Sequence, residues 1–303
     1  MTSSANISAF EGVRHTGGRR VDRLPHSGVD GREAFSRSGF GSIEVIRGPE
    51  KSVVSRALAM SPLRLLTPDN HGHAAWIYTS TYGGGLVDGD IISLHLRVAQ
   101  KAAAFVSTQA STKVYRSPRG SDVEMRADIE PSGLLVVVPD PVVCFAASRY
   151  RQTQRLDVSE GAGLVLVDWV SSGRRASGER WEFDEYVSRT IVRHRDRLVL
   201  HDATALRSSD SNLATRIGRF DVLALVVIVG EALESETAAI VASINQQPIV
   251  RRSDLLTSIA PLGDSGCVVR IAGRSVEQVG RHIRQLLGFV PRLLGDDPWA
   301  RKW

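Results

Sequence analysis

The chain has 303 residues, of which 42% are hydrophobic and 23% are charged, and no apolar run approaches the length of a membrane-spanning helix. This length and composition suit one large domain or two small ones with a substantial core. The formal net charge is +5, but only four of the 38 basic residues are Lys, and the Arg residues are mostly interleaved with acidic residues. This distribution favours a solvated surface and an Arg-rich protein interface over nucleic-acid binding.

Residues 1–38 are polar, rich in Gly, Ser and Arg, and lack hydrophobic periodicity. They predict a disordered N-terminal tail, followed by a single β-rich domain over residues 39–303. The N-terminal segment contains no apolar stretch of the kind that directs secretion, so we expect a cytoplasmic protein. From Phe40 onwards, short apolar runs separated by Gly, Pro and Asp are typical of β-strands.

The centre of the chain contains a weak repeat of strand–turn–strand units. The first strands end at Val98, Ile129, Val158 and Val192, and the equivalent positions of the second strands are Val106, Val137, Leu166 and Leu200. Both series advance by 31, 29 and 34 residues, as the residue numbers show. The repeat favours an ordered stack of units, with an ordinary meander of similar strands as the alternative.

Alternation of apolar and polar residues before each turn indicates first strands with one buried face. The second strands are more continuously apolar, which predicts that they are covered on both faces. We therefore expect a mainly β fold, with a layered or β-helical body of antiparallel strands.

The last third of the chain has a different pattern, which predicts a small α/β C-terminal portion with helices mainly after residue 230. An amphipathic helix follows Gly230, and residues 265–273 are typical of a strand. A second helix is predicted to begin after Ser275, because Ser275 and Gln278 form a capping-box pattern.

Cysteine and histidine give little indication of a tight metal site. Cys144 and Cys267 both lie in apolar surroundings, which favours two buried free thiols. His71 and His73 have a spacing with which a strand could present imidazoles to nickel, but they follow residues 67–70, a turn-like segment. A surface turn is therefore favoured over a metal site. We find no P-loop, no nucleophile–base pair and no closed zinc pattern, so the sequence predicts a protein that is not an enzyme.

Residues 83–90 form a glycine-rich turn, Gly-Gly-Gly-Leu-Val-Asp-Gly-Asp. No Lys-Ser/Thr follows it, and a strand follows where a dinucleotide-binding fold would start a helix. A tight turn with positive φ explains Gly83, Gly84, Gly85 and Gly89. It does not explain Asp90, whose carboxylate lies at the entrance of the next strand.

Two further polar segments follow apolar strands. Residues 108–116 contain Thr108 and Gln109, which suit either an ordinary strand exit or the polar wall of a cavity, and Lys113, Tyr115 and Arg116, which could project onto a partner. Residues 171–183 contain Arg174, Glu179, Arg180 and Trp181. This segment suits a hairpin loop in which Glu179 makes a surface ion pair, or a polar passage in which its carboxylate is a reversible ligand for a divalent ion.

Together these segments resemble the signatures of the UreD (UreH) family of urease accessory proteins. The glycine-rich turn resembles the family pattern GGGLV-x-GD, and residues 107–117 resemble TTQ-x-x-TK-x-YRS. A second block resembles SGR-x-A-x-GE-x-W-x-F, and its matching positions are Gly173, Arg174, Ala176, Gly178, Glu179, Trp181 and Phe183. The resemblance covers about residues 39–230 and is weak beyond them, where Trp299 is displaced from the family's PR-x-W-like ending.

The resemblance implies a largely β scaffold that helps to install nickel in urease, with transient Ni²⁺ and no tightly bound cofactor. It implies binding to UreF, assembly through UreF with the nickel GTPase UreG, and direct contact with apo-urease, without a nucleic-acid or membrane partner. It also implies that Asp90, Glu179 and the segment around Thr108 and Gln109 line a passage for Ni²⁺. A basic, β-rich nucleic-acid-binding protein is the alternative, and it rests on net charge alone.

Overall fold

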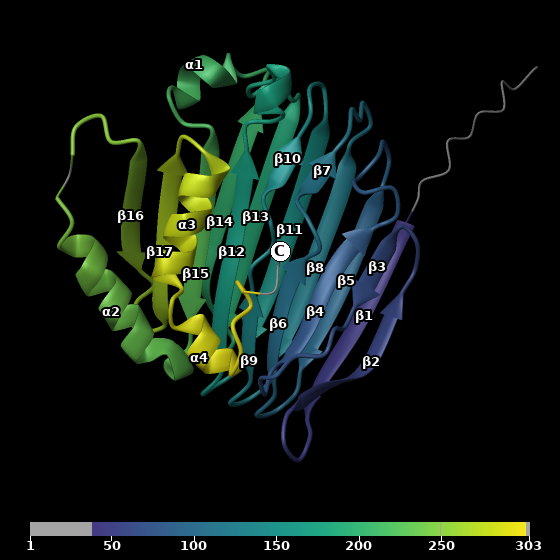
Figure 1. Ribbon diagram of the computed structural model, residues 1–303, viewed down its shortest axis with the longest axis vertical. Coiled ribbons are helices and arrows are strands. Elements are labelled where there is room, and N and C mark those ends of the chain that lie inside the picture. Colours follow the sequence, from purple (N-terminus) through teal and green to yellow (C-terminus); the bar gives the residue numbers. More distant parts are fainter. Residues whose placement is uncertain (1–37, 249, 301–303) are drawn as a thin grey trace, which may run out of the picture. The chain divides into compact units, whose positions relative to one another are not determined.

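The computed structural model describes residues 38–248 and 250–300. The tail predicted over residues 1–38 therefore lies outside the described residues, apart from Ser38, with which the first strand begins. The described residues form two facing β-sheets, and helices pack on the ten-stranded one (Figure 1). The mainly β prediction is confirmed, and the helices lie mainly after residue 230.

One sheet has seven strands, in the order β14-β13-β11-β8-β5-β1-β2. Its strands are β1 (Ser38–Arg47), β2 (Ser52–Ala59), β5 (Ile91–Val98), β8 (Ser121–Ile129), β11 (Arg149–Val158), β13 (Glu185–His194) and β14 (Arg197–Arg207). The other sheet has ten strands, with the main order β16-β17-β15-β12-β9-β6-β4-β3 and with β10 pairing both β12 and β7. Its strands are β3 (Leu63–Leu66), β4 (Ala75–Thr81), β6 (Ala103–Thr108), β7 (Thr112–Val114), β9 (Leu134–Val137), β10 (Val142–Cys144), β12 (Gly163–Ser171), β15 (Val222–Val229), β16 (Leu255–Pro261) and β17 (Gly266–Gly273).

The helices are short. They are η1 (Arg175–Ser177), α1 (Leu213–Ile217), η2 (Glu231–Leu233), α2 (Glu234–Asn245), α3 (Val276–Leu286) and α4 (Val290–Leu294). The predicted N-cap of α3 is confirmed, because the Ser275 side chain accepts a hydrogen bond from the Gln278 backbone N–H. No described helix is both long enough and apolar enough to cross a membrane.

The sequence repeat corresponds to coils that pass from one sheet to the other. Val98, Ile129 and Val158 pair in register in the seven-stranded sheet. Val106, Val137 and Leu166 pair in register in the ten-stranded sheet. The turns at residues 99–102, 130–133 and 159–162 therefore cross between the sheets, which is the β-helical arrangement that the spacing predicted.

The fourth predicted unit does not cross, so its prediction is wrong. β13 and β14 pair antiparallel within the seven-stranded sheet, and Leu200 lies opposite Val192. The connection consists of Arg195 and Asp196, which both have positive φ (51° and 60°). Two residues in this conformation form a tight hairpin turn, which returns the chain to the same sheet.

The predicted antiparallel body is also wrong for the centre of both sheets. β1, β5, β8, β11 and β13 are joined by parallel pairing, as are β4, β6, β9 and β12. Antiparallel pairs occur towards the margins, for example between β1 and β2 and between β12 and β15. Equivalent strands of stacked coils run in the same direction and therefore pair in parallel. The alternation of apolar and polar side chains is the same in parallel and antiparallel sheets, so it did not reveal the strand direction.

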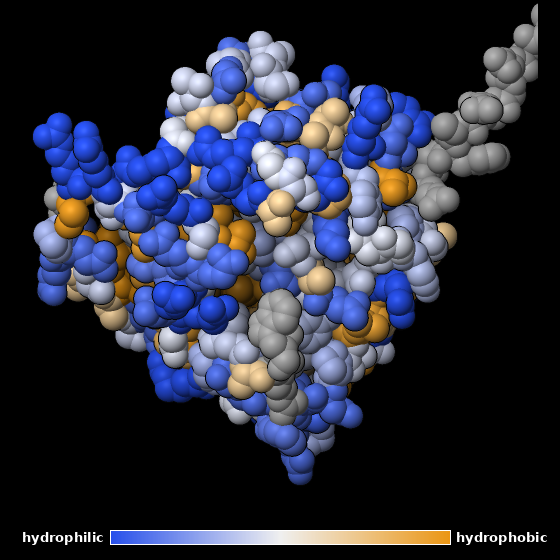
Figure 2. Space-filling model, turned by 45° about the horizontal axis from the view of Figure 1, so that its top comes forward, coloured by the Kyte–Doolittle hydropathy of each residue, from blue (hydrophilic) through white to orange (hydrophobic). Residues whose placement is uncertain are grey.

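The prediction that second strands are covered on both faces is confirmed for β12, in which all nine residues are buried. Leu164 and Leu166 pack into the core between the sheets, whereas Val165 and Val167 belong to the cluster beneath the helices. Both cysteines are buried free thiols, as predicted. The face in Figure 2 is mostly hydrophilic, with small separate hydrophobic areas.

The stacked positions predict a strong effect of truncation at Ile129, which is 1% exposed and lies between Val98 and Val158. We expect Ile129→Ala to lower the free energy of unfolding by about 2–5 kcal/mol, because it leaves a cavity in the row. Urea denaturation measures this change. Val53→Ala on the edge strand β2, where Val53 is 38% exposed, is the control and should change the stability by less than about 0.5 kcal/mol. Equal small effects would contradict the stacking argument.

Candidate functional site

A cavity of about 280 Å³ lies where the ten-stranded sheet is interrupted. Residues 109–111 separate β6 from β7, and residues 138–141 separate β9 from β10. The cavity extends from this interruption into the space between the sheets, where Ile92, Leu94 and Met125 of the seven-stranded sheet line it. It therefore joins a polar rim to a partly apolar interior.

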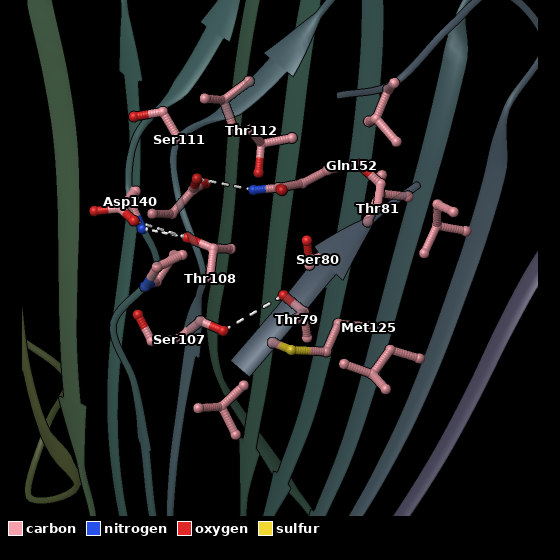
Figure 3. A pocket seen from close by; sticks show the side chains of 18 of the residues that line it. Thr79, Ser80, Thr81, Ser107, Thr108, Ser111, Thr112, Met125, Asp140 and Gln152 are labelled. Atoms are coloured by element: carbon pink, nitrogen blue, oxygen red, sulfur yellow. Dashed lines mark hydrogen bonds between the residues drawn. The ribbon is translucent and has the colours of Figure 1, made fainter. Parts of the chain in front are cut away.

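The rim is rich in hydroxyl groups (Figure 3). Thr79, Ser111 and Thr112 lie around the cavity with Thr108. The Thr108 hydroxyl accepts a hydrogen bond from the Asp140 backbone N–H (2.8 Å) and donates one to the Asp140 carboxylate (3.3 Å). Asp140 is half-buried and lines the cavity, so its carboxyl group belongs to the rim.

Thr108 and Gln109 occupy the position that the sequence suggested for a polar wall. Both line the cavity, and the Gln109 backbone N–H donates to the Thr79 carbonyl across the rim (2.9 Å). The Gln109 side chain is exposed. Gly84 and Gly85 also line the cavity, which brings part of the glycine-rich turn to the same place.

The inner wall contains a buried carboxylate that sequence reasoning missed. Asp168 of β12 is 8% exposed and lines the cavity together with Gln152 and Gln154 of β11. Burial raises the pKa of the Asp168 carboxyl, and hydrogen bonds from Ser188, Gln152 and Tyr186 offset part of this effect. A signal was present in the sequence, because Asp168 is the one charged residue in a continuously apolar strand.

The glycine-rich turn has the conformation that the sequence indicated. Gly83, Gly84 and Gly89 have φ values of 87°, 70° and 84°. Gly85 is required for a different reason, since a Cβ atom there would lie 2.7 Å from the Lys113 carbonyl oxygen. These contacts support the structural role of the turn.

Asp90 belongs to this turn and not to the cavity wall. Its side chain is 2% exposed, and one carboxylate oxygen accepts a hydrogen bond from the Val87 N–H (2.8 Å). Asp90 therefore closes the turn from within, as Asp commonly does at such positions. The structure does not place Asp90 with the other cavity residues.

Glu179 is likewise separate from the cavity. Arg174 donates two hydrogen bonds to its carboxylate, one of 3.0 Å from Nε, and the Ala146 N–H donates a third (3.3 Å). The hydrogen bonds from Arg174 are the main cause that lowers the pKa of the Glu179 carboxyl. This side chain fixes the loop after β12 against the loop after β10, which leaves little of it available as a metal ligand.

The six partner-binding candidates divide into two groups. Lys113 and Arg116 are exposed, Tyr115 packs edge-on against Phe145 (5.2 Å between ring centroids), and Arg174 lies over the same ring. Arg180 and Trp181, like Tyr115 and Arg174, have partners within the chain. Arg180 binds Asp221 (2.6 Å), and the buried Trp181 donates from its indole N–H to the Phe220 carbonyl (3.0 Å).

His71 and His73 lie in an exposed turn against the C-terminal segment. The His71 backbone N–H donates to the Asp296 carboxylate (2.9 Å), and the His73 N–H donates to the Leu294 carbonyl (3.0 Å). Within residues 38–248 and 250–300, no three or more His, Cys, Asp or Glu side chains gather in an arrangement that could hold a metal ion. The turn therefore has a visible structural role.

Comparison with known proteins places these features in a family. Residues 38–303 match the family of the UreD urease accessory protein. The chain is 50% identical over 267 residues to urease accessory protein UreD of Sorangium cellulosum (strain So ce56), and the aligned region covers 88% of this chain and 85% of that protein. It is 39% identical to urease accessory protein UreD of Anaeromyxobacter sp. (strain Fw109-5), over 91% and 94% of the two chains. It is 34% identical to urease accessory protein D of Oryza sativa subsp. indica, over 88% and 96%.

The contacts of Glu179 predict a pH-dependent contribution to stability. Because the folded-state pKa of Glu179 is lowered, its contribution is present above the unfolded-state pKa near 4.5 and is lost as the pH falls through the folded-state value. We expect Glu179→Gln to lower the free energy of unfolding by about 1–2 kcal/mol at pH 7, with the difference from the wild type shrinking below about pH 4.5. Thermal unfolding over a pH series measures it.

The control for this series is Glu160→Gln, since the Glu160 side chain is 79% exposed. It should leave the melting temperature nearly unchanged at every pH. A Glu179→Gln protein as stable as the wild type at pH 7 would contradict the structural role of Glu179.

Proposed function

The chain belongs to the UreD family of urease accessory proteins, and we propose that it is a cytoplasmic scaffold through which Ni²⁺ reaches the urease active site. Proteins of this family are accessory proteins rather than enzymes, and their names place them in urease maturation. In our proposal the chain acts with UreF-type and UreG-type accessory proteins and contacts apo-urease directly.

The observation that carries the nickel proposal is the cavity at the interruption of the ten-stranded sheet. Among the described residues, its lining includes the carboxyl groups of Asp140 and Asp168 and several hydroxyl groups, but neither His nor Cys. Oxygen ligands hold Ni²⁺ less tightly than imidazole or thiolate groups do. A passage must release the ion as readily as it accepts it, so a lining of this kind suits transfer.

The size of the cavity fits a hydrated ion. A cavity needs about 10–15 Å³ of accessible volume to hold one water molecule. The cavity volume of about 280 Å³ leaves room for such an ion beside the rim hydroxyls. The ion need not lose its whole hydration shell on entry, which keeps binding weak and exchange fast.

The passage keeps Thr108 and Gln109, which the sequence suggested as wall groups and which line the cavity. Asp140 takes the role for which Asp90 and Glu179 were candidates, because the carboxylates of Asp90 and Glu179 are held in turn and loop contacts. The exposed side chains of Lys113 and Arg116 follow the rim segment in the chain. We propose that they contact the accessory partner that delivers or receives the ion.

The nucleic-acid alternative receives no support from the outer face of the seven-stranded sheet. Arg97 there pairs with Glu44 and Glu130, and Arg151 pairs with Asp122 and Glu185. Such alternation of charge favours a solvated surface over a track for phosphate groups.

The passage predicts a specific effect of Asp140→Asn. This variant removes the rim charge but keeps a side chain of nearly the same size, so the fold and the complex with a UreF-type partner should remain. We expect nickel per urease active site to fall severalfold at limiting nickel, because the rim attracts the cation less strongly. Metal analysis of purified urease, beside co-purification of the accessory complex, is the measurement.

Asp254→Asn is the matched control, because Asp254 is 57% exposed and pairs with Arg274 away from the cavity. It should leave nickel loading unchanged. Full nickel loading with Asp140→Asn would reject the rim as the entrance, and loss of the accessory complex would reassign Asp140 to assembly.

A further inference from the structure

Three polar side chains from distant parts of the sequence meet where the end of β13 approaches the turn between β16 and β17. The His194 Nδ1 atom lies 3.1 Å from the Ser265 hydroxyl oxygen, and the His194 Nε2 atom lies 3.0 Å from a Glu231 carboxylate oxygen. The His194 side chain is only 6% exposed. Sequence reasoning could not find this cluster, because 71 and 37 positions separate His194 from its two partners.

The partners of His194 determine which ring nitrogen carries the proton. Burial raises the pKa of the Glu231 carboxyl, but its own backbone N–H, His194 and Arg195 lower it more, so the pKa lies below its usual value. Glu231 is therefore ionised at pH 7 and can only accept hydrogen bonds, which places the His194 proton on Nε2. Nδ1 of the neutral ring then accepts the proton of the Ser265 hydroxyl.

The backbone around the cluster is closely packed. The Gly230 N–H donates to the Ser265 carbonyl (2.8 Å), which connects η2 to the β16–β17 turn. A Cβ atom at Gly230 would lie 2.0 Å from the Ala162 carbonyl oxygen, and one at Gly266 would lie 1.9 Å from a carbonyl oxygen of β15. Only glycine fits at these positions, directly before Glu231 and directly after Ser265. The two side chains are thus presented by backbone that cannot easily move.

Ser265 also lines a surface hollow of about 980 Å³. Leu198, Val199 and Leu262 give this hollow an apolar wall, and Leu198 is 57% exposed. Ser265 is half-buried, whereas His194 is buried behind it. A small molecule with an apolar group can therefore reach the Ser265 hydroxyl from solvent.

Backbone N–H groups lie in the same turn. Gly263 and Asp264 line the hollow, and their N–H groups have no hydrogen-bond partner among the described residues. Such groups stabilise the negative oxygen that forms when a carbonyl carbon is attacked. The Ser265 N–H is already engaged, since it donates to the Leu262 carbonyl (3.1 Å). Stabilisation is therefore weaker than in an efficient hydrolase, which suits a single acyl transfer better than rapid turnover.

We propose that Ser265 is an acyl-accepting serine, activated by His194 as general base, and that its substrate is an activated ester of a short apolar acyl group. A nucleophile within hydrogen-bond reach of a base, with a third group that orients the base, is the arrangement that forms covalent acyl intermediates. Glu231 is a positioning residue, because it acts on the His194 ring and not on the substrate. The proposal is independent of the nickel passage.

The acyl transfer needs no oxidant or reductant. The Ser265 Oγ atom attacks the acyl carbon, and its proton passes to His194 Nδ1. The bond between the acyl carbon and the leaving oxygen then breaks, and the proton moves from Nδ1 to the leaving alcohol. The products are an ester of Ser265 and the free alcohol.

The test is incubation of the purified full-length chain with p-nitrophenyl butyrate, followed by measurement of p-nitrophenol release and by peptide mass mapping. We expect a burst of about one p-nitrophenol per chain and a butyryl group on Ser265. Ser265→Ala should abolish the burst, and His194→Gln should slow it by about a hundredfold or more. Ser258→Ala is the matched control, because Ser258 is exposed on β16 of the same hairpin, and it should react as the wild type does.

Mass mapping of the wild type keeps the test decisive even if a variant does not fold. Butyryl groups on other residues with none on Ser265 would overturn the proposal. The reaction must also depend on the folded arrangement, so the chain unfolded in urea should not acylate Ser265. Equal acylation of Ser265 in the folded and the unfolded chain would likewise reject activation by His194.

The role of Glu231 is tested by two substitutions that separate charge from size. Glu231→Asp keeps the negative charge with a shorter side chain, whereas Glu231→Gln keeps the size without the charge. If the charge of Glu231 supports proton transfer to His194, the burst should be faster in Glu231→Asp than in Glu231→Gln. The opposite order would show that Glu231 has only a structural role.

Discussion

In-register parallel pairing between successive coils determines both the composition of the interior and the position of the cavity. Each crossing turn delivers the next strand to the opposite sheet, so residues about 30 positions apart in the sequence become neighbours. Pairing of this kind places equivalent positions of successive coils in rows. A change from apolar to polar residues at one strand therefore changes the polarity of the interior from that strand onwards. A polar region of the interior arises in this way, because Gln152 and Gln154 replace apolar residues in rows that Val123 and Met125 share.

The same register positions the cavity. The breaks after β6 and after β9 occur in neighbouring strands, so residues 109–111 and 138–141 open the ten-stranded sheet at one place. β7 and β10 resume the pairing beyond the break, and they keep the opening local. A rigid frame around a short irregular segment holds polar groups in fixed positions, which favours a defined ligand site over a flexible one. Thr108 and Asp140 are joined across this opening by their own hydrogen bonds.

Much of the fold could be predicted because the spacing of apolar residues follows the structural repeat. Spacing alone identified the rows through Ile129 and Val137, and the continuous apolar run of β12 correctly indicated cover on both faces. Strand direction could not be predicted, since alternation is the same in parallel and antiparallel sheets. The site was harder, because motif residues that look chemical proved to be structural. Asp90 and Glu179 hold turns together, whereas Asp140 and Asp168 lie outside the signature segments at residues 83–90, 107–117 and 171–183.

Asp168 shows how an energetic conflict can identify function where a motif does not. Burial raises the pKa of the Asp168 carboxyl in the folded protein. The free energy of unfolding therefore decreases as the pH rises from the pKa of the unfolded chain towards the pKa of the folded protein, because ionisation is then favoured in the unfolded chain. An Asn at this position would keep hydrogen-bonding groups near Ser188 and Gln152 without that cost. The conflict lies in the strand whose other residues are all suited to burial, and it lies beside the cavity. Local violations of an otherwise consistent pattern are expected at functional positions, and Asp168 lines the cavity that we propose as the nickel passage.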